Sequence, residues 1–339
     1  MHNFINEWTT DDFSRHLKEC LGWTKKVVSF KIAGDGNMNF TYRLVFDDAM
    51  SIIVKQSPPF CARFPDIPAP EERILSEFKY YDLVAKDQFL SDHSPALLGL
   101  DDDNKIAYIS DLGDARDFDF LYKQAKKLDQ GTSEKLIQYL VKLHQLEIPD
   151  ELEFDNLGMR KLNHSYIFDL PFRGGSEAID LNNITPGLTA IVRDIINDEN
   201  LKQSAKNLGD LYFQKSRTLI HGDYYPMSWI ETKKGLFVID PEFGFLGLAE
   251  IDLGVFLAHM LLSNNYQIAI ETLNSSYGSY DSELVAEFAA AEVIRRIVYV
   301  SQLPLINSLS FKKELLLKSA MVLKTGDMEI YEKLDFINS

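Results

Sequence analysis

The chain has few cysteines, no long apolar run and a deficit of positive charge. Its 339 residues include only Cys20 and Cys61, which are too few and too isolated for a disulfide framework or a zinc site. No stretch approaches the roughly eighteen apolar residues that a membrane-spanning helix needs, so we expect no membrane span. Met1–Phe4 shows no basic region followed by an apolar core, so we expect no signal peptide and a reducing, cytoplasmic setting.

Acidic residues outnumber basic ones, with 51 Asp and Glu against 35 Lys and Arg and a net charge of −16. This balance disfavours non-specific binding to nucleic acid or to an anionic membrane. An anionic ligand must therefore be met by a local basic cluster rather than by the overall field. Hydrophobic residues make up 45% of the chain, which is ordinary for a globular protein, and the length allows two domains or lobes.

Strand-like and helical patterns divide the chain into an early sheet region and a later helical region. Trp8, Phe13 and Leu17 share a helical stripe near the start. Strand-like runs are expected over residues 27–33, 40–46, 51–55 and 105–110, and a helix over residues 71–86. This pattern predicts an antiparallel meander with a tight first turn.

From about residue 114 the apolar period becomes helical, and only residues 218–240 return to strands. Thr132 or Ser133 is expected to cap a helix whose apolar face runs from Leu136 to Leu143. Further helices are expected over residues 253–262, 281–300 and 312–323. The prediction is an α+β fold, with a small antiparallel-sheet lobe in residues 1–110 and a large helical lobe in residues 111–339.

Two apolar runs, each expected to form a strand, end in acidic residues that lie about seventeen residues apart. Residues 219–223 read Leu-Ile-His-Gly-Asp, and residues 238–242 read Val-Ile-Asp-Pro-Glu. A phosphoryl transferase needs such groups: Asp223 would accept the proton of an attacking hydroxyl, while Asp240 and Glu242 would hold magnesium on the nucleotide phosphates. Each motif alone is typical of an ordinary turn, so their order and spacing carry the hypothesis.

A turn between the first two strand-like runs supplies candidates for phosphate binding. The turn consists of Gly34, Asp35, Gly36 and Asn37. Glycine lets the backbone approach a ligand closely, and successive N–H groups can cradle phosphate oxygens. An ordinary hairpin turn is the alternative interpretation.

A strand lysine and a helix glutamate complete the nucleotide candidates. Lys55 ends the third strand-like run and suits a point-charge contact to phosphates. Glu77 on the next helix could orient Lys55 through an ion pair, and Glu71 and Glu72 compete for that role. An exposed strand-end lysine is the simpler alternative.

Two adjacent arginines, Arg295 and Arg296, interrupt a strongly apolar helical segment. Adjacent helical residues point about 100° apart, so both cannot face solvent if the helix packs on two sides. One interpretation is salt bridging to the many surface acids. The other is a cationic wall that helps to hold a substrate or the transferring phosphate.

In this order, the motifs resemble the aminoglycoside phosphotransferase and choline kinase group of small-molecule kinases, over residues 27–323. Within the group the chain looks most like the methylthioribose kinases, on residues 34–39, 53–56, 240–247, 252–254 and 293–298. Ser228 stands five residues after the first acid, as in methylthioribose kinases, where most of the group has asparagine. Tyr225 departs from the family, which usually has histidine there.

The resemblance implies a protein-kinase-like bilobal fold and a reaction that transfers the γ-phosphate of ATP, with Mg²⁺, to the anomeric hydroxyl of S-methyl-5-thioribose. Asp223 would be the base, Asp240 and Glu242 the magnesium ligands, and Lys55 a phosphate contact. The backbone of Ser110 to Leu112 would serve adenine, with groups of Ser110 and Leu112 as the hinge, while Arg295 and Arg296 would line the sugar site. Family members form dimers, so a homodimer is also implied.

Two other functions stay open from the sequence. The acceptor could be another small hydroxylated molecule, such as an amino sugar, an aminoglycoside or an amino alcohol, although the arginine pair disfavours a cation. A nucleotide-binding module without activity is the second. Its support is Ser228, because a serine hydroxyl is a weaker magnesium ligand than an asparagine carbonyl.

Overall fold

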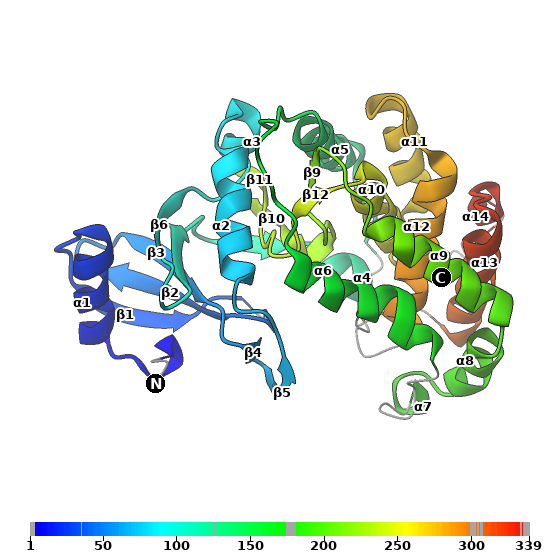
Figure 1. Cartoon of the computed structure of the whole chain (residues 1–339), viewed down its shortest axis with the longest axis horizontal. Coiled ribbons are helices and arrows are strands. Elements are labelled where there is room, and N and C mark those ends of the chain that lie inside the picture. The colour runs from blue at the N-terminus through cyan, green and yellow to red at the C-terminus, as the bar shows by residue number, and fades with distance from the viewer. Residues whose placement is uncertain are drawn as a thin grey trace. The chain divides into compact units, whose positions relative to one another are not determined.

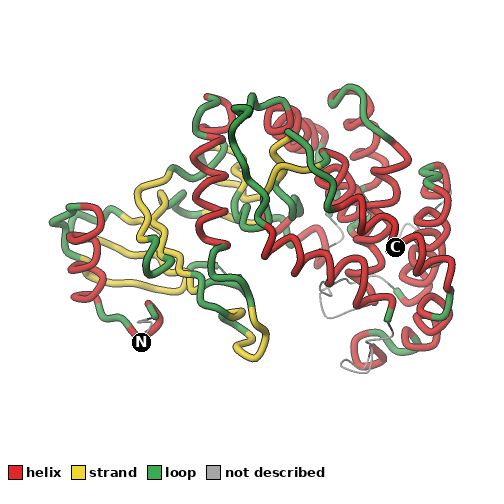
Figure 2. The backbone as a smooth tube through the Cα atoms, in the orientation of Figure 1, coloured by secondary structure: helices red, strands yellow, loops and turns green. Residues whose placement is uncertain are grey.

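The computed structural model describes residues 4–34, 36–124, 126–173, 181–298, 303, 305, 308–332 and 334. They form two compact units (Figures 1 and 2). The first comprises Met1–Arg116, Phe154–Met159 and Ile230–Phe245, and the second Asp117–Glu153, Arg160–Trp229 and Leu246–Ser339. Residues 154–159 and 230–245 thus belong to the first unit, and the expected division of function at residue 110 stays a prediction.

The first unit is built on a five-stranded antiparallel sheet in the order β1-β2-β3-β7-β6. Its strands are β1 (Val27–Ile32), β2 (Phe40–Phe46), β3 (Ser51–Gln56), β6 (Leu97–Asp101) and β7 (Ile106–Ser110). The predicted strands are therefore confirmed almost to the residue. The predicted helix over 71–86 is α2 (Arg73–Val84), which is followed by α3 (Gln88–Asp92).

Helix α1 (Thr10–Leu21) covers part of this sheet. Thr9 and Asp12 form a capping box at its start, and Gly22 at φ 68° ends it in the left-handed conformation. Its apolar stripe, Phe13 and Leu17, packs in one core with alternate strand residues such as Leu44 and Val54. The alternation of the strands thus leaves the opposite side chains, Ile53 and Lys55 among them, on the other face.

The remaining elements of the first unit are short. They are the 3₁₀ turn Ile5–Glu7, the hairpin of β4 (Phe60–Cys61) and β5 (Phe64–Pro68), and a sheet of β11 (Gly235–Val238), β10 (Trp229–Thr232) and β8 (Ala115–Asp117). β11 leads directly into the second acid motif.

The second unit is mainly helical. Its helices are α4 (Phe120–Lys123), α5 (Gln130–His144), α7 (Leu181–Ile184), α8 (Leu188–Ile196), α9 (Glu199–Tyr212), α10 (Ala249–Leu262), α11 (Tyr266–Ser276), α12 (Ser282–Val298), α13 (Leu309–Thr325) and α14 (Glu329–Glu332). The division between the units falls within α6 (Leu157–His164). A π-turn (Ser165–Asp169), two 3₁₀ turns (Leu170–Phe172 and Pro226–Ser228) and the pair β9 (Thr218–Ile220) with β12 (Phe245–Gly247) complete the described elements.

Helices α10 and α12 form the centre of the second unit. A Cβ on Gly254 of α10 would lie 2.5 Å from Cβ of Phe288 and 3.0 Å from the backbone nitrogen of Ala289 on α12, so only glycine permits this approach. The predicted helices over 253–262 and 312–323 are confirmed as α10 and α13, and α12 covers the predicted 281–300 as far as Val298. One local prediction was wrong, because Asp129 rather than Thr132 or Ser133 caps α5, with its side chain accepting from the Thr132 backbone.

The α+β prediction is therefore confirmed, with an antiparallel sheet in the N-terminal part and helices in the C-terminal part. Among the described helices, none combines the length and apolar character needed to cross a membrane.

Candidate active site

Lys55 is buried in the first unit between two carboxylates. It lies on β3, opposite Thr41 of β2 and Ala107 of β7, and only 6% of it is exposed. Its Nζ lies 2.6 Å from Oε1 of Glu77 and also pairs with Asp240. Burial alone would lower the pKa of Lys55, but the charges of Asp240 and Glu77 outweigh burial and raise that pKa well above its ordinary value. The lysine is therefore charged, and it is not the exposed strand-end residue of the alternative.

Glu77 is the glutamate that reaches the lysine. It lies in the middle of α2 and is 2% exposed, and burial raises its pKa. Glu71 and Glu72 precede the helix, and Glu72 is its N-terminal flanking residue. The competition left open by the sequence thus ends in favour of Glu77, and the expected ion pair is present.

The second acid motif follows β11 in the first unit. Asp240 has a left-handed φ of 61°, a conformation that is uncommon for residues other than glycine and that aspartate tolerates better than most. The side chain of Asp240 is 45% exposed and that of Glu242 is 12% exposed. Burial raises the pKa of Glu242 to about 7, against the opposing charge of Arg73. Asp240 and Glu242 thus lie two residues apart in the sequence. Asp240 pairs with Lys55, whereas the partners of Glu242 are Arg73 and Asn39.

Arg73 and Asn39 hold Glu242, and sequence reasoning missed both. Asn39 Nδ2 donates to Glu242 Oε2 at 2.9 Å, and Arg73 Nε lies 3.7 Å from the same oxygen. Arg73 is fully buried at the first position of α2, and its Nε donates to Asn39 Oδ1 at 2.9 Å. Its remaining N–H groups donate to the carbonyls of Met38, Pro58, Phe60 and Pro70. One guanidinium therefore ties α2, the segment before β2 and the β4–β5 hairpin together.

The predicted phosphate turn links β1 and β2, and one of its residues, Asp35, lies outside the described residues. Gly34 has a left-handed φ of 76°. A Cβ placed on Gly34 or Gly36 would meet no described atom within 4 Å, so space is open beside both. The carbonyl of Asn37 accepts from the backbone N–H of Arg63 at 3.0 Å, which anchors the end of the turn to the β4–β5 hairpin.

The predicted hinge follows β7. Ser110 is the last residue of this strand, and its Oγ accepts from the backbone N–H of Ala96 at 2.9 Å. Asp111 receives Arg43 Nε and Ser51 Oγ, both at 2.6 Å from its Oδ2, and Leu112 is half-buried. Side chains of β2 and β3 therefore fix the centre of this segment to the sheet.

Asp223, the first acid, follows β9 in the second unit, in a loop held by another buried acid. Asp252 is fully buried on α10, and it accepts from the backbone N–H groups of His221 at 2.7 Å and Gly222 at 2.8 Å. Gly222 has a left-handed φ of 80°. Ser228 Oγ donates to the carbonyl of Asp223 at 3.1 Å. Asp252 thus anchors the loop that carries Asp223, and sequence reasoning assigned it no role.

The arginine pair meets Asp223. Arg296 Nη2 donates to Asp223 Oδ1 at 3.2 Å, and Arg295 Nη2 lies 3.6 Å from the same oxygen. Burial raises the pKa of Asp223, although both guanidinium groups oppose this rise. Arg295 is 6% exposed and Arg296 8% exposed, and their acidic partners are Asp223 and the buried Glu292. Both arginines therefore form salt bridges, as one interpretation expected, but these partners are buried or largely buried rather than surface acids.

A model of the phosphotransferase enzyme family matches residues 29–288 of the chain. The chain belongs to this family. The chain is 29% identical over 240 residues to methylthioribose kinase from Bacillus cereus (strain G9842), and 25% identical over 261 residues to methylthioribose kinase 2 from Oryza sativa subsp. japonica. These alignments cover 68% and 72% of this chain, but only 59% and 58% of the two relatives.

Solved structures of phosphotransferases share the fold. A spectinomycin phosphotransferase in complex with ADP and spectinomycin superimposes with a TM-score of 0.55 at 12% identity, over 94% of this chain and 99% of that one. Choline kinase from Streptococcus pneumoniae superimposes with a TM-score of 0.52 at 16% identity, over 92% and 97%. The resemblance to the aminoglycoside phosphotransferase and choline kinase group is thus confirmed at the level of family and fold.

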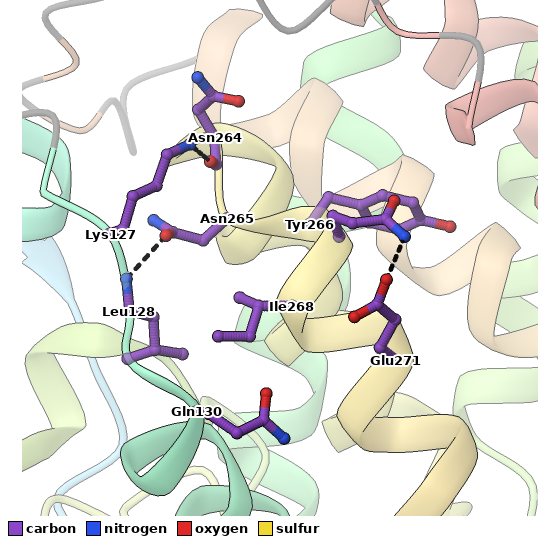
Figure 3. A pocket seen from close by; sticks show the side chains of 9 residues that line it. Lys127, Leu128, Gln130, Asn264, Asn265, Tyr266, Ile268 and Glu271 are labelled. Atoms are coloured by element: carbon purple, nitrogen blue, oxygen red, sulfur yellow. Dashed lines mark hydrogen bonds between the residues drawn. The ribbon is translucent and has the colours of Figure 1, made fainter.

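A separate surface pocket of about 430 Å³ lies in the second unit where α10 meets α11 (Figure 3). It is lined by Lys127, Leu128, Gln130, Asn264, Asn265, Tyr266, Gln267, Ile268 and Glu271. Asn265 Oδ1 accepts from the Leu128 backbone at 2.8 Å, and Gln267 donates to Glu271. The pocket contains none of the residues that the sequence singled out.

Proposed function

We propose that this phosphotransferase-family chain transfers the γ-phosphoryl group of ATP to a hydroxyl of a small metabolite. The observation that carries the proposal is Lys55, buried on β3 and paired with both Glu77 and Asp240. Phosphoryl transfer by kinases uses such a lysine–glutamate pair and an aspartate at the metal. Burying a cation between carboxylates costs desolvation energy, so a role in function explains this arrangement better than a gain in stability does.

The first unit supplies the proposed nucleotide side. Lys55 would contact the ATP phosphates, with Glu77 holding its ammonium in place. Backbone N–H groups of the predicted turn Gly34, Asp35, Gly36 and Asn37 would donate to phosphate oxygens, and space is open beside Gly34 and Gly36. Backbone carbonyl and N–H groups of Ser110 and Leu112 would accept hydrogen bonds from adenine and donate hydrogen bonds to it. The contacts of Asp111 with Arg43 and Ser51 would keep this segment in position.

Asp240 and Glu242 fit a magnesium ion. Both offer carboxylate oxygens, the ligands that Mg²⁺ prefers, and Asp240 is half-exposed while Asn39 and Arg73 orient Glu242. When bound, the ion would neutralise charge on the nucleotide phosphates. Around such an ion, Asn39 and Arg73 would orient Glu242, and Lys55 would pair with Asp240 and add a positive charge.

The second unit supplies the proposed acceptor side. Asp223 would accept the proton of the attacking hydroxyl, and burial favours this because it raises the pKa of the carboxyl towards that of a better base. Asp252 would fix the loop that carries Asp223. Arg295 and Arg296 would position the acceptor beside this carboxylate.

The acceptor that we propose is S-methyl-5-thioribose, phosphorylated at its anomeric hydroxyl. The names of the curated relatives support this choice, as does the arginine pair, which favours a neutral hydroxylated molecule over a cation such as an aminoglycoside or choline. An assay of ADP release with ATP and Mg²⁺ tests it over methylthioribose, ribose, other pentoses, amino sugars, choline, homoserine and an aminoglycoside. Turnover of methylthioribose alone supports the full proposal, and turnover of another acceptor keeps the kinase and replaces the substrate. Silence with every acceptor, with ATP still binding, favours an acceptor outside this panel or a nucleotide-binding module.

A further inference from the structure

Glu292 of α12 is a buried carboxylate placed between the two arginines. It lies one turn before them and is 1% exposed. Its Oε1 accepts from Arg295 Nη2 and from Arg296 Nε, each at 2.7 Å, and its Oε2 lies 2.7 Å from Arg295 Nε. These distances are shorter than the 3.2 and 3.6 Å that separate the same arginines from Asp223. Glu292 is therefore the principal acceptor for both guanidinium groups.

A histidine and a tyrosine orient Glu292 from the other side. His259 Nε2 lies 3.1 Å from Glu292 Oε1, and His259 Nδ1 lies 2.5 Å from the hydroxyl of Tyr122. An ionised carboxylate only accepts hydrogen bonds, so Nε2 carries the proton and Nδ1 accepts from the tyrosine. Tyr122, His259 and Glu292 are all buried, and hydrogen bonds join the tyrosine to the histidine and the histidine to the glutamate. The carboxylate is thus fixed independently of any ligand.

Arg296 is also held on its face. Its guanidinium carbon lies 4.9 Å from the centroid of the Tyr225 ring, within the range of a cation–π contact. The same ring lies 5.0 Å from the His259 ring, measured between centroids. Tyr225 thus packs against both ends of the arrangement, Arg296 and His259.

Without Glu292, the two cations would have Asp223 as their nearest carboxylate. A carboxylate that accepts directly from two guanidinium groups is a poor base, because both cations stabilise its ionised form. We propose that Glu292 is a positioning residue for phosphoryl transfer: it draws Arg295 and Arg296 towards itself, so that the Asp223 carboxylate accepts, among the described residues, only one long hydrogen bond, from Arg296, and keeps acceptor capacity for the proton of the acceptor hydroxyl. This inference rests on the proposed function, in which Asp223 is the base.

The electrostatics around Asp223 agree with this role. The charged and ionisable groups around it are Arg295, Arg296 and Glu292 of α12, His221 of its own loop, Tyr122 of α4, Tyr212 of α9, His259 of α10 and Tyr225. Glu292 raises the pKa of Asp223, whereas both arginines lower it. Burial opposes ionisation of Glu292, but the two guanidinium groups hold its pKa well below the ordinary value, so it is charged throughout the neutral range.

Kinetics of Glu292→Gln test the proposal, with Glu287→Gln as the matched control. Glu287 lies five residues earlier on α12 and is half-buried. In Glu292→Gln, kcat/KM for the acceptor should fall about 10- to 100-fold while KM for ATP changes less than about twofold. The acidic limb of the kcat/KM profile should move to lower pH, because the arginines then act on Asp223 unopposed. Glu292→Asp, which keeps the charge, should restore the position of that limb.

A pH profile of Glu292→Gln that coincides with that of the wild type would overturn the proposal. A rise in KM for ATP as large as the loss of kcat/KM for the acceptor would overturn it too, since it would indicate general damage to the fold. Glu287→Gln should match the wild type in both readouts.

A measurement without turnover separates this inference from the proposed function. The Nε–H of Arg296 donates to Glu292, so in the wild type it should exchange slowly with solvent in an arginine ¹H–¹⁵N correlation spectrum, assigned with Arg296→Lys. In Glu292→Gln this proton should exchange about tenfold faster or more, and in Glu287→Gln at the wild-type rate. If no acceptor is turned over but this difference is seen, the proposed function fails while Glu292 still positions the arginine. Unchanged exchange in Glu292→Gln contradicts the inference itself.

Discussion

The ammonium group of Lys55 lies 2.6 Å from the carboxylate of Glu77, and this contact joins the central strand β3 to helix α2. Both residues are almost fully buried, so the ion pair is screened little by solvent. Lys55 also pairs with Asp240, which couples the strand and the helix to the loop after β11. The account of this chain as a kinase depends on that arrangement.

Removing the charge of Glu77 should weaken the nucleotide site. In Glu77→Gln, Lys55 keeps only Asp240 as a charged partner and is no longer held against α2, so we expect KM for ATP to rise about tenfold. Glu72→Gln makes the same change on an exposed residue beside α2 and should leave KM for ATP as it is. Steady-state ADP release at varied ATP measures both, and equal values for the two variants would argue against the role of Glu77.

Arg73→Lys should destabilise the first unit although it keeps the positive charge. Lysine cannot donate to Asn39 and to four carbonyls at once, and buried acceptors left without donors cost about 1–3 kcal/mol each. We expect unfolding free energy to fall by about 3 kcal/mol or more in urea titrations, and the Mg²⁺ concentration for half-maximal ADP release to rise. Arg63→Lys, on the exposed part of the β4–β5 turn, is the control. A stability equal to that of the control would show that the hydrogen bonds of Arg73 contribute little.

The stability of the second unit should decrease in mild acid because of His259. Burial lowers the pKa of His259 to about 4, from an ordinary value of 6.5. Between these values the unfolded chain binds more protons than the folded one, so stability is lost as pH falls. From pH 7.5 to pH 5 the loss from this histidine should be about 2 kcal/mol.

His259→Gln should remove that part of the pH dependence, whatever its effect on stability at neutral pH. Urea unfolding of the wild type and the variant at the two pH values measures the difference. Glu292 does not interfere, since its folded pKa is depressed and its contribution is lost only below the ordinary range of a carboxyl. An identical pH dependence in both proteins would mean that folding leaves the pKa of His259 at its ordinary value.

The sequence predicted the fold well because the decisive signals are local. Strand alternation located β1, β2, β3 and β7, and helical periodicity located α2, α10, α12 and α13. The Lys55–Glu77 pair was also predictable, because few candidate acids follow the strand lysine on the next helix. The cap of α5 was missed because Asp129, Thr132 and Ser133 are all good capping residues, and only backbone geometry chooses between them.

The supporting residues of the site could not be predicted in the same way. Arg73 and Glu292 are charged residues in helices, and such residues usually lie at the surface. Their burial depends on partners remote in sequence, as when Glu292 meets His259 or Asn39 meets Glu242. Asp252 likewise acts on backbone groups of a loop some thirty residues earlier. An apolar neighbourhood around a charged residue, as around Arg295 and Arg296, was the one local signal available.

The most direct test of the account is ADP release by Asp223→Asn, measured together with ATP affinity by calorimetry. Asparagine keeps the shape of the side chain but cannot take a proton, so turnover should be abolished while the dissociation constant for ATP stays within about twofold of the wild type. Asp210→Asn, the same change on an exposed residue of α9, should behave as the wild type. Turnover by Asp223→Asn at the wild-type rate would contradict the assignment of Asp223 as the base.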